Sequence, residues 1–385
     1  MNKLKVGFVF TGGFPEGEVH NSRIRNIGSG FIRNQWSCDF ISIYPTSFSK
    51  KSDNPRQSVW KNQKIIHIGG WYQYPPFFIL RCIQLIYCHL AFLCFILLKI
   101  KNYDVVYFYT PQFVSSLPGL VLSKLFNAKI IVDYTDLHSV NKFSLWHKFE
   151  EIIMLKYADC VLVISNFLFN HFGAEHENIH VIPMMVDFKE FSQPIQPIPF
   201  NIGYIGSFGE KDGVSDILNA LAIALKDEPR ITLTMIGRDP HKIKTKQIIK
   251  SLGLNDHVVL VGGVNHSKVE TSLKKCDTFI MNRKKSAFSD SGYPAKLGEY
   301  LACQRPILMS DCILFSSDFE HKKEVLKYKH DNPNDLANAI LYRYRNPNEM
   351  TEMAIRGHLY AKGKFDSENI STKVVELASK LVESV

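Results

Sequence analysis

A chain of 385 residues is too long for one compact core, so its length favours two domains. Its hydrophobic content of 45% is that of a folded protein, and its net charge of +9 favours an anionic partner: nucleic acid, an acidic membrane surface or a phosphorylated small molecule. The eight cysteines form no CxxC pair and no paired metal spacing, and several lie in apolar runs, which predicts reduced, buried thiols and argues against a disulfide framework.

The first half of the chain predicts alternating strands and helices. The apolar run Val6–Phe10 is short and no small-residue cleavage site follows it, which predicts a strand and not a signal peptide. It ends in the glycine loop Thr11–Gly13, which is neither a GxGxxG fingerprint nor a P-loop. The loop after a strand at 129–133 carries Asp136 and His138, at the strand end where open α/β sheets bind ligands. Further strands are predicted at Cys38–Tyr44, Ile65–Ile68, Val105–Tyr109 and Cys160–Ile164.

The most apolar stretch of the chain is Phe77–Leu98, which is long enough to raise the question of a membrane span. The strands before and after it look like members of one parallel sheet, and a single crossing would place them on opposite sides of a bilayer. We therefore predict a core helix covered by the sheet. The alternative is a helix that also presents Phe, Leu and Tyr side chains to a membrane, beside the basic residues 49–64. Those basic residues are predicted to form a solvated loop, with a lipid or phosphate contact as the alternative.

Residues 183–199 contain four prolines and predict a linker, after which a second α/β series begins at Phe200. Its strands are predicted at 202–205, 231–236, 258–261 and 278–281. Glycines and cations follow several of these strands. The longest of these glycine-rich turns contains Lys211. Two similar α/β halves with a cleft between them are expected.

Residues 291–306 combine a Gly-Tyr-Pro turn, a short helical pattern and the helix stop Arg305-Pro306. Free backbone N–H groups at such a helix start suit an anionic ligand. Lys296 and Glu299 are one turn apart, where a cation and a hydroxyl acceptor can bind one ligand together. The stretch predicts a site for a phosphate and a ribose.

The order of motifs along nearly the whole chain resembles that of the GT-B glycosyltransferases, specifically the retaining family 4 (glycosyl transferases group 1) and its subgroup with a PxKxxEYLA motif. The matching segments are Phe14–Gly17 with Arg23, Val163–Asn166, Val181–Asp187 with Phe191, Tyr204–Gly206 with Lys211–Gly213, Ile236-Gly237, Leu260–Val264, Asp277–Met281, and Pro294–Lys296 with Glu299–Ala302. Each motif alone is weak, and their common order and spacing make the resemblance specific.

The resemblance implies an α/β protein of the GT-B fold, with two Rossmann-like, doubly wound parallel-sheet domains that face a central cleft. It implies an N-terminal acceptor-binding domain at residues 1–188, a C-terminal nucleotide-sugar-binding domain at 200–365, and a helix at 366–385 that packs back on the N-terminal domain. The residues then expected to bind the nucleotide sugar are Gly13, Arg23, Gly206, Lys211, Arg238, Gly263, Gly292, Tyr293, Pro294, Lys296 and Glu299, and those expected to act in catalysis are Asp136 and His138.

The implied activity is the transfer of a sugar, with retention, from a nucleotide diphosphate sugar, UDP-linked, to a lipid-linked or other saccharide acceptor in surface polysaccharide assembly. No cofactor and no metal is expected, because cations and N–H groups of the protein can stabilise the leaving diphosphate. The expected location is the cytoplasm, at the inner face of the membrane where Phe77–Leu98 makes a lipid contact.

The chain departs from the family pattern at two positions. Ser291 stands where the family often has a first glutamate, with Asp290 beside it, and Ser207 stands where the family has an arginine. Two other functions therefore stay open: a GT-B sugar-nucleotide epimerase, and a nucleotide-sugar-binding subunit without catalysis. A nucleic-acid-binding role has the least support, because the basic residues are scattered.

Overall fold

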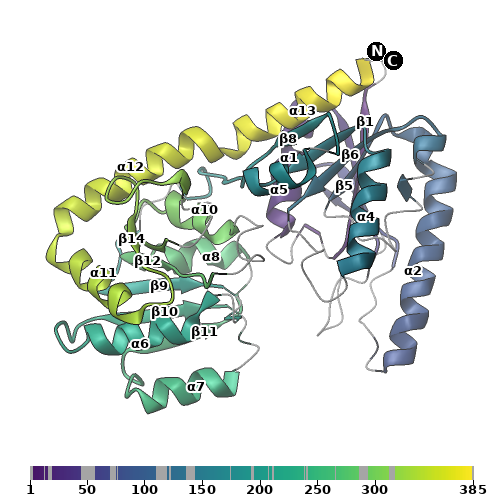
Figure 1. Cartoon of the computed structure of the whole chain (residues 1–385). Coiled ribbons are helices and arrows are strands. Elements are labelled where there is room, and N and C mark those ends of the chain that lie inside the picture. Colours follow the sequence, from purple (N-terminus) through teal and green to yellow (C-terminus); the bar gives the residue numbers. More distant parts are fainter. Residues whose placement is uncertain are drawn as a thin grey trace. The chain divides into compact units, whose positions relative to one another are not determined.

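The computed structural model describes residues 3–12, 14–15, 20–44, 57–69, 75, 77–109, 119–120, 123–135, 144–173, 175–191, 195–206, 208–209, 212–237, 239, 242–264, 266–285, 294–311 and 317–383. The chain divides into two compact units (Figure 1). The first consists of Met1–Met185 together with Ser367–Val385, and the second of Val186–Asp366. The end of the chain therefore returns to the unit in which the chain begins.

The first unit is built on an eight-stranded sheet with the order β3-β4-β2-β1-β5-β6-β7-β8. All neighbouring strands are parallel except the hairpin β3-β4. The central strands are buried on both faces, which explains why they are continuous apolar runs in the sequence. The strand bounds are β1 Lys5–Phe10, β2 Ser37–Ser42, β3 Gln57–Trp60, β4 Gln63–His67, β5 Val105–Tyr109, β6 Lys129–Tyr134, β7 Cys160–Val163 and β8 Ile179–Val181.

One of these strands corrects the sequence prediction. The solvated loop predicted for residues 49–64 is wrong in its second part, because Gln57–Trp60 pairs as β3 with β4. Residues 49–56 lie outside the described residues.

Helices cover the sheet of the first unit, and one of them comes from the end of the chain. Side chains of α13 complete the hydrophobic core of this unit, among them Ile370 and Val374. Arg33 of α1 also donates a hydrogen bond to the hydroxyl of Ser371, at 2.8 Å. The helices are α1 His20–Arg33, α2 Phe78–Lys99, the 3-10 helix η1 Ile100–Asn102, α4 Ser144–Tyr157, α5 Asn166–Phe172 and α13 Ser367–Glu383.

The contact between α1 and α13 depends on a glycine. A Cβ atom on Gly30 would collide with the side chain and the backbone of Ser371, whereas a Cβ atom on Gly363 of α12 (Pro347–Phe365) would meet no atom within 4 Å. We expect Gly30→Ala to lower the free energy of unfolding by about 1–3 kcal/mol through overpacking. Gly363→Ala is the matched control and is expected to leave the free energy unchanged or raise it by up to about 1 kcal/mol. Urea unfolding of both variants tests this, and equal effects would contradict the packing argument.

The second unit is a doubly wound domain on a six-stranded, entirely parallel sheet with the order β11-β10-β9-β12-β13-β14. The chain runs outward from β9 to β11 and then returns to the other side of β9 with β12, so the strand order reverses between β9 and β12. The elements are β9 Asn201–Ile205, α6 Val214–Ala224, β10 Thr232–Ile236, α7 Lys242–Ser251, β11 Val258–Gly262, α8 His266–Leu273, β12 Thr278–Met281, α10 Ala295–Ala302, β13 Ile307–Ser310, β14 Leu326–Tyr328, α11 Pro333–Arg345 and α12 Pro347–Phe365.

The helix predicted at Phe77–Leu98 is present as α2, but the prediction that the sheet covers it as a core helix is wrong. Only Cys88, Phe92 and Ile96 of α2 are buried, along one narrow stripe. Most of its other apolar side chains are exposed. By length and composition, α2 with η1 is long and apolar enough to cross a membrane. It does not separate its flanking strands, since β4 and β5 belong to one sheet through β2 and β1.

Candidate functional site

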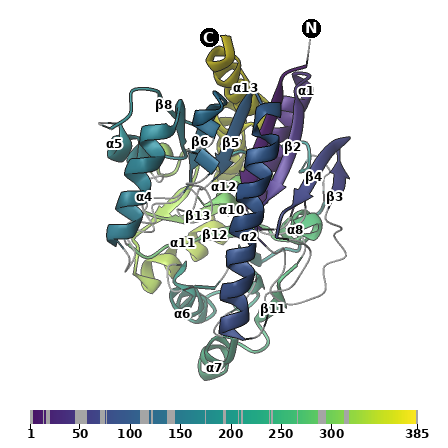
Figure 2. The same cartoon turned by 90° about the vertical axis from the view of Figure 1, so that its right-hand side faces the viewer.

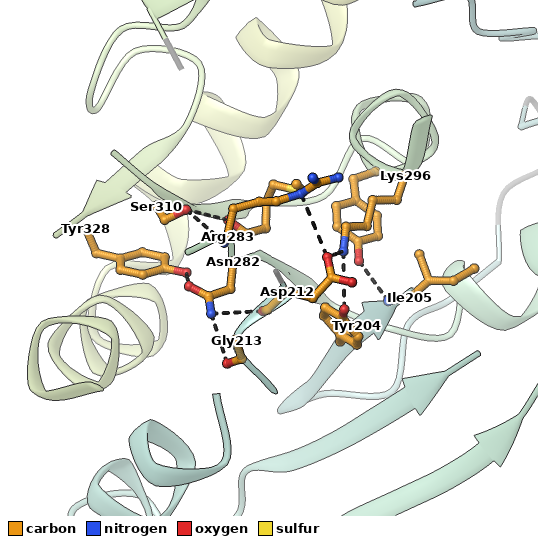
Figure 3. Close-up of polar contacts among 11 residues, drawn as sticks. Tyr204, Ile205, Asp212, Gly213, Asn282, Arg283, Lys296, Ser310 and Tyr328 are labelled. Carbon is orange, nitrogen blue, oxygen red and sulfur yellow. Dashed lines mark hydrogen bonds and ion pairs between the residues drawn. The ribbon is translucent and has the colours of Figure 1, made fainter. Parts of the chain in front are cut away.

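The candidate site lies in the second unit, at the carboxyl ends of β9 and β12. Open α/β sheets bind ligands at the point where the strand order reverses, and in this unit that point lies between these two strands. Three segments distant in the sequence meet there: the turn after β9, the residues that follow β12, and the start of α10 (Figure 3).

Two cations face one carboxylate at the centre of the site. The Nζ atom of Lys296 donates a hydrogen bond to Oδ1 of Asp212 at 2.8 Å, and Nε of Arg283 lies 3.8 Å from the same oxygen. Asp212 and Arg283 are buried and Lys296 is largely so, with exposed side-chain fractions of 3%, 9% and 10%. These three groups therefore carry a net charge of +1 in an environment where charges interact strongly. Such a centre favours an anionic ligand.

Tyr204 of β9 supports the ammonium group of Lys296. The Nζ atom donates to the Tyr204 hydroxyl at 3.3 Å and lies 4.5 Å from the centre of its ring, which is a cation–π distance. Burial, and then the nearby Asp212 carboxylate, raise the pKa of Tyr204 well above its usual value, so that its phenol stays neutral. Gly206 follows β9, and a Cβ atom there would lie 2.5 Å from the Tyr204 hydroxyl oxygen and 3.1 Å from Nζ of Lys296. A glycine is therefore required for the close approach of this turn.

A hydrogen-bond network fixes the turn that carries Asp212 to the end of β12. The side-chain amide of Asn282 donates to the carbonyl oxygens of Asp212 and Gly213, at 3.1 and 3.0 Å, and its oxygen accepts from the Tyr328 hydroxyl at 2.8 Å (Figure 3). Gly213 has φ of +56°, and a Cβ atom there would lie 2.5 Å from the Asn282 amide nitrogen. Asp212 and Gly213 are therefore held to the end of β12.

The backbone around Arg283 and the packing of α10 are fixed as well. The N–H group of Arg283 donates to the hydroxyl of Ser310 at the end of β13, at 3.1 Å. On α10, the Tyr300 hydroxyl accepts from the N–H group of Ile205 at 2.8 Å, and its ring stacks on Phe279 with 4.3 Å between the centroids. These contacts hold α10 and the strand ends in one arrangement, so the cations are preorganised for a ligand.

The structure brings several of the predicted nucleotide-sugar residues together. Gly206 and Lys296 belong to the centre described above. Pro294 is buried and precedes α10 with an extended backbone, and the half-buried Glu299 lies on the same short helix, three residues after Lys296. Gly263 is exposed and follows β11, the edge strand, so it lies two strands away from β9.

Other predicted residues lie outside the described residues. These are Gly13, Asp136, His138, Lys211, Arg238, Gly292 and Tyr293, together with the two departures Ser207 and Ser291.

Arg23, expected to bind the nucleotide sugar, lies in a buried hydrogen-bond network, and its assignment to the ligand stays a prediction. Its guanidinium group is buried in the first unit and donates two hydrogen bonds to the carboxylate of Asp133, at 2.8 and 2.9 Å. It also donates to the carbonyl oxygens of Ile182 and Pro183, at 2.9 and 2.7 Å, while Tyr107 donates to Asp133 at 2.6 Å. Burial by itself lowers the pKa of Arg23, but the charge and hydrogen bonds of Asp133 outweigh it and raise the pKa above its usual value. Arg23 therefore joins α1 to β6 and to the segment after β8.

Sequence reasoning missed Asp212, Asn282 and Arg283 as site residues. A signal was present for Arg283, because the cations Arg283–Lys285 directly follow the predicted strand at 278–281. Asp212 lies in the same glycine-rich turn as the predicted Lys211. Its pairing with Lys296 becomes visible only when the two segments are placed together.

A known family model matches the part of the chain that contains this site. Residues 186–358 match the family model of the glycosyl transferases group 1. An uncharacterized glycosyltransferase, YqgM of Bacillus subtilis (strain 168), is 26% identical over 134 residues, an alignment that covers 34% of this chain and 37% of the relative.

Solved structures resemble the whole chain. Sucrose-phosphate synthase from Thermosynechococcus elongatus has a TM-score of 0.80 at 17% identity, with 100% of both chains covered. Anabaena Alr3699/HepE in complex with UDP and glucose has a TM-score of 0.74 at 16% identity, with 98% of this chain and 99% of that chain covered. At such identities the likeness shows the fold alone. That fold has two parallel-sheet α/β domains and is GT-B, so the predicted fold class is confirmed.

Proposed function

Because residues 186–358 match the family model of the glycosyl transferases group 1 and the chain has a GT-B fold, we propose that the chain transfers a sugar from a nucleotide diphosphate sugar to a saccharide acceptor. UDP is the proposed nucleotide, retention the proposed stereochemical outcome, and a lipid-linked saccharide of surface polysaccharide assembly the proposed acceptor. Among the structural neighbours, Alr3699/HepE was solved with UDP and glucose, which supports the choice of UDP for the first experiments.

The observation that carries the proposal is the convergence of Lys296 and Arg283 on Asp212 at the reversal point of the sheet. A leaving nucleotide diphosphate gains negative charge as the glycosidic bond breaks, and fixed cations stabilise that charge. We assign the diphosphate to Lys296 and Arg283. Arg283 then supplies the second cation in a chain that has Ser207 where the family has an arginine.

The same proposal gives roles to other residues. Glu299 accepts hydrogen bonds from the ribose hydroxyls, since a carboxylate one turn after Lys296 on α10 is a strong acceptor.

In a retaining reaction on one face of the sugar, the acceptor hydroxyl passes its proton to the departing phosphate and no protein nucleophile is required. Asp136 and His138, which lie outside the described residues, are proposed to orient the sugar and to stabilise the oxocarbenium-like carbon.

A donor assay tests the proposal. The purified chain is incubated with a UDP-sugar, with and without a saccharide acceptor, and each reaction is run with and without EDTA. We expect UDP release only when the acceptor is present, and no loss of rate with EDTA, because side chains provide the cations. Release of UDP with free sugar, or inversion at C2 of the donor, would favour an epimerase or hydrolase. Donor binding without turnover across an acceptor panel would favour a non-catalytic binding subunit.

A further inference from the structure

Helix α2 presents an unusually apolar surface on the outside of the first unit. Figure 2 shows the helix at the front of this unit, with no described element over its outward side. Its outward side chains have exposed fractions between 46% and 78%. They are Phe78, Ile79, Leu80, Ile83, Ile86, Tyr87, Leu90, Leu97 and Leu98. Soluble proteins rarely leave so continuous an apolar surface uncovered, so this face indicates a binding surface.

The helix is fixed along one side and cannot turn out of its place to cross a bilayer. Its buried stripe packs on the first unit, where Phe92 fills the space beside Gly119. The strands before and after it, β4 and β5, belong to one sheet. A crossing would place these strands on opposite sides of the bilayer and break their pairing through β2 and β1. A lipid contact of α2 is therefore parallel to the membrane surface.

The charges along α2 select an anionic partner. From Phe77 to Tyr103 the sequence contains no Asp or Glu, whereas Arg81 lies in the first turn and Lys99 in the last. Lys101 follows in η1, with its Nζ atom 5.1 Å from the ring centre of Phe126. Leu125, the neighbour of Phe126 in the sequence, is also exposed. Exposed apolar side chains with cations beside them suit contact with an anionic bilayer surface, where acyl chains and lipid phosphates meet.

A second copy of the chain fits this face less well. Two α2 helices packed antiparallel would bring Arg81 of one copy beside Lys99 of the other, and two packed parallel would bring each cation beside its own equivalent. Neither arrangement has a carboxylate on the helix to neutralise the cations. Anionic lipid headgroups supply that negative charge, and acyl chains accept the apolar side chains.

We propose that α2 binds an anionic bilayer surface, with its outward apolar face in the acyl boundary and Arg81, Lys99 and Lys101 at the lipid phosphates. The inference deepens the proposed function, because lipid binding by α2 would keep the enzyme at the membrane, where a lipid-linked acceptor is found. The role given to lipid binding rests on the proposed function. Lipid binding by α2 does not, because it needs neither donor nor acceptor.

Vesicle flotation of the full chain tests the proposal. The probes are phosphatidylcholine vesicles with and without about one third phosphatidylglycerol, and UDP binding is measured in parallel. We expect the chain to float with the anionic vesicles, and the variant Ile83→Asp/Leu90→Asp to bind them at least roughly 10-fold more weakly. The matched control is Leu359→Asp on α12, an equally exposed leucine (62%) of the second unit, which is expected to float like the unchanged chain.

The outcomes separate the two proposals. Loss of flotation in the α2 variant, with flotation kept in the control, supports the inference. This holds even if the chain does not bind UDP and the proposed function is wrong. Failure of the unchanged chain to float overturns it. Equal flotation of the α2 variant overturns it too, as does a dimer that the α2 substitutions make monomeric without any change in lipid binding.

A native cysteine provides a second readout. Cys94 of α2 is exposed, whereas burial raises the pKa of the Cys88 thiol to about 11 and keeps that thiol unreactive. We expect maleimide labelling of the peptide that contains Cys94, followed by mass spectrometry, to slow several-fold on addition of anionic vesicles. An unchanged labelling rate with the protein bound to vesicles would place another surface against the lipid and overturn the assignment of α2.

Discussion

Replacing Lys296 by methionine is expected to lower kcat for sugar transfer by about 10²–10³-fold, the loss typical of removing one preorganised group that stabilises transition-state charge. Methionine keeps much of the volume of the lysine stem but removes the ammonium group that binds Asp212 and faces Tyr204. The diphosphate then leaves with Arg283 as the remaining cation of this centre. Steady-state kinetics with a UDP-sugar and the acceptor found in the donor assay measures the loss.

The control for this prediction separates catalysis from stability. Lys296→Met leaves the buried carboxylate of Asp212 without its closest cation, and removing one partner of a buried pair costs about 3–5 kcal/mol. The double variant Lys296→Met/Asp212→Asn removes both charges and is expected to regain much of that stability while its kcat stays low. Recovery of kcat together with stability would show that Lys296 is structural and does not contact the donor.

A substitution of Arg283 tests the second cation of the centre by ligand binding. We expect Arg283→Gln to weaken UDP binding by about 10-fold or more, the value of a charge-assisted contact to phosphate, while uridine binds as before. Lys284 is the matched neighbour: it is 45% exposed and lies 3.7 Å from Asp216. An equal loss of UDP affinity in Lys284→Gln would indicate a general field effect and argue against a direct contact of Arg283.

The two sheets could be predicted from the sequence because parallel strands buried on both faces are continuous apolar runs. The strands at Val6–Phe10 and Lys129–Asp133 were predicted for this reason, and the structure has them as β1 and β6. The hairpin strand β3 was not predicted, because it is an edge strand in a basic, polar segment. A pattern based on continuous burial cannot detect such a strand.

Only those residues of the site that are close together in the sequence could be predicted from it. Lys296 and Glu299 are neighbours on one short helix, so their spacing indicated a shared ligand. The pairing of Lys296 with Asp212 joins residues 84 positions apart, and local spacing contains no information about it. Arg23 shows the same limit, because its motif predicts a ligand contact while the structure pairs it with Asp133, 110 positions away.

Helix α2 shows a further limit of sequence patterns. A helix that is apolar on all sides predicts burial, because such a helix in a soluble protein usually lies in a core. Whether other elements cover it is a property of the tertiary structure. In the part of the chain that the structure describes, Cys88, Phe92 and Ile96 are the buried residues of α2, so the same composition leaves a broad apolar surface.

The buried pair of Arg23 and Asp133 leads to a large expected effect on stability. We expect Arg23→Met to lower the free energy of unfolding by about 3–5 kcal/mol, because Asp133 is fully buried and loses its cation. The carbonyl oxygens of Ile182 and Pro183 lose a donor as well. Arg23→Lys is expected to recover only part of the loss, since an ammonium group cannot reproduce the two-pronged contact of a guanidinium with a carboxylate. Urea unfolding followed by circular dichroism measures these changes.

The control for Arg23 is an exposed ion pair made by another arginine of the same helix. Arg33 of α1 is 41% exposed and 3.9 Å from Glu368, and surface pairs of this kind contribute about 0–1 kcal/mol. Glu368→Gln, which removes this pair and keeps the bond from Arg33 to Ser371, is therefore expected to have a small effect. Arg23→Met is expected to bind UDP with unchanged affinity at a temperature where the variant is folded. A large loss of UDP affinity in the folded Arg23→Met variant would support a contact of Arg23 with the donor.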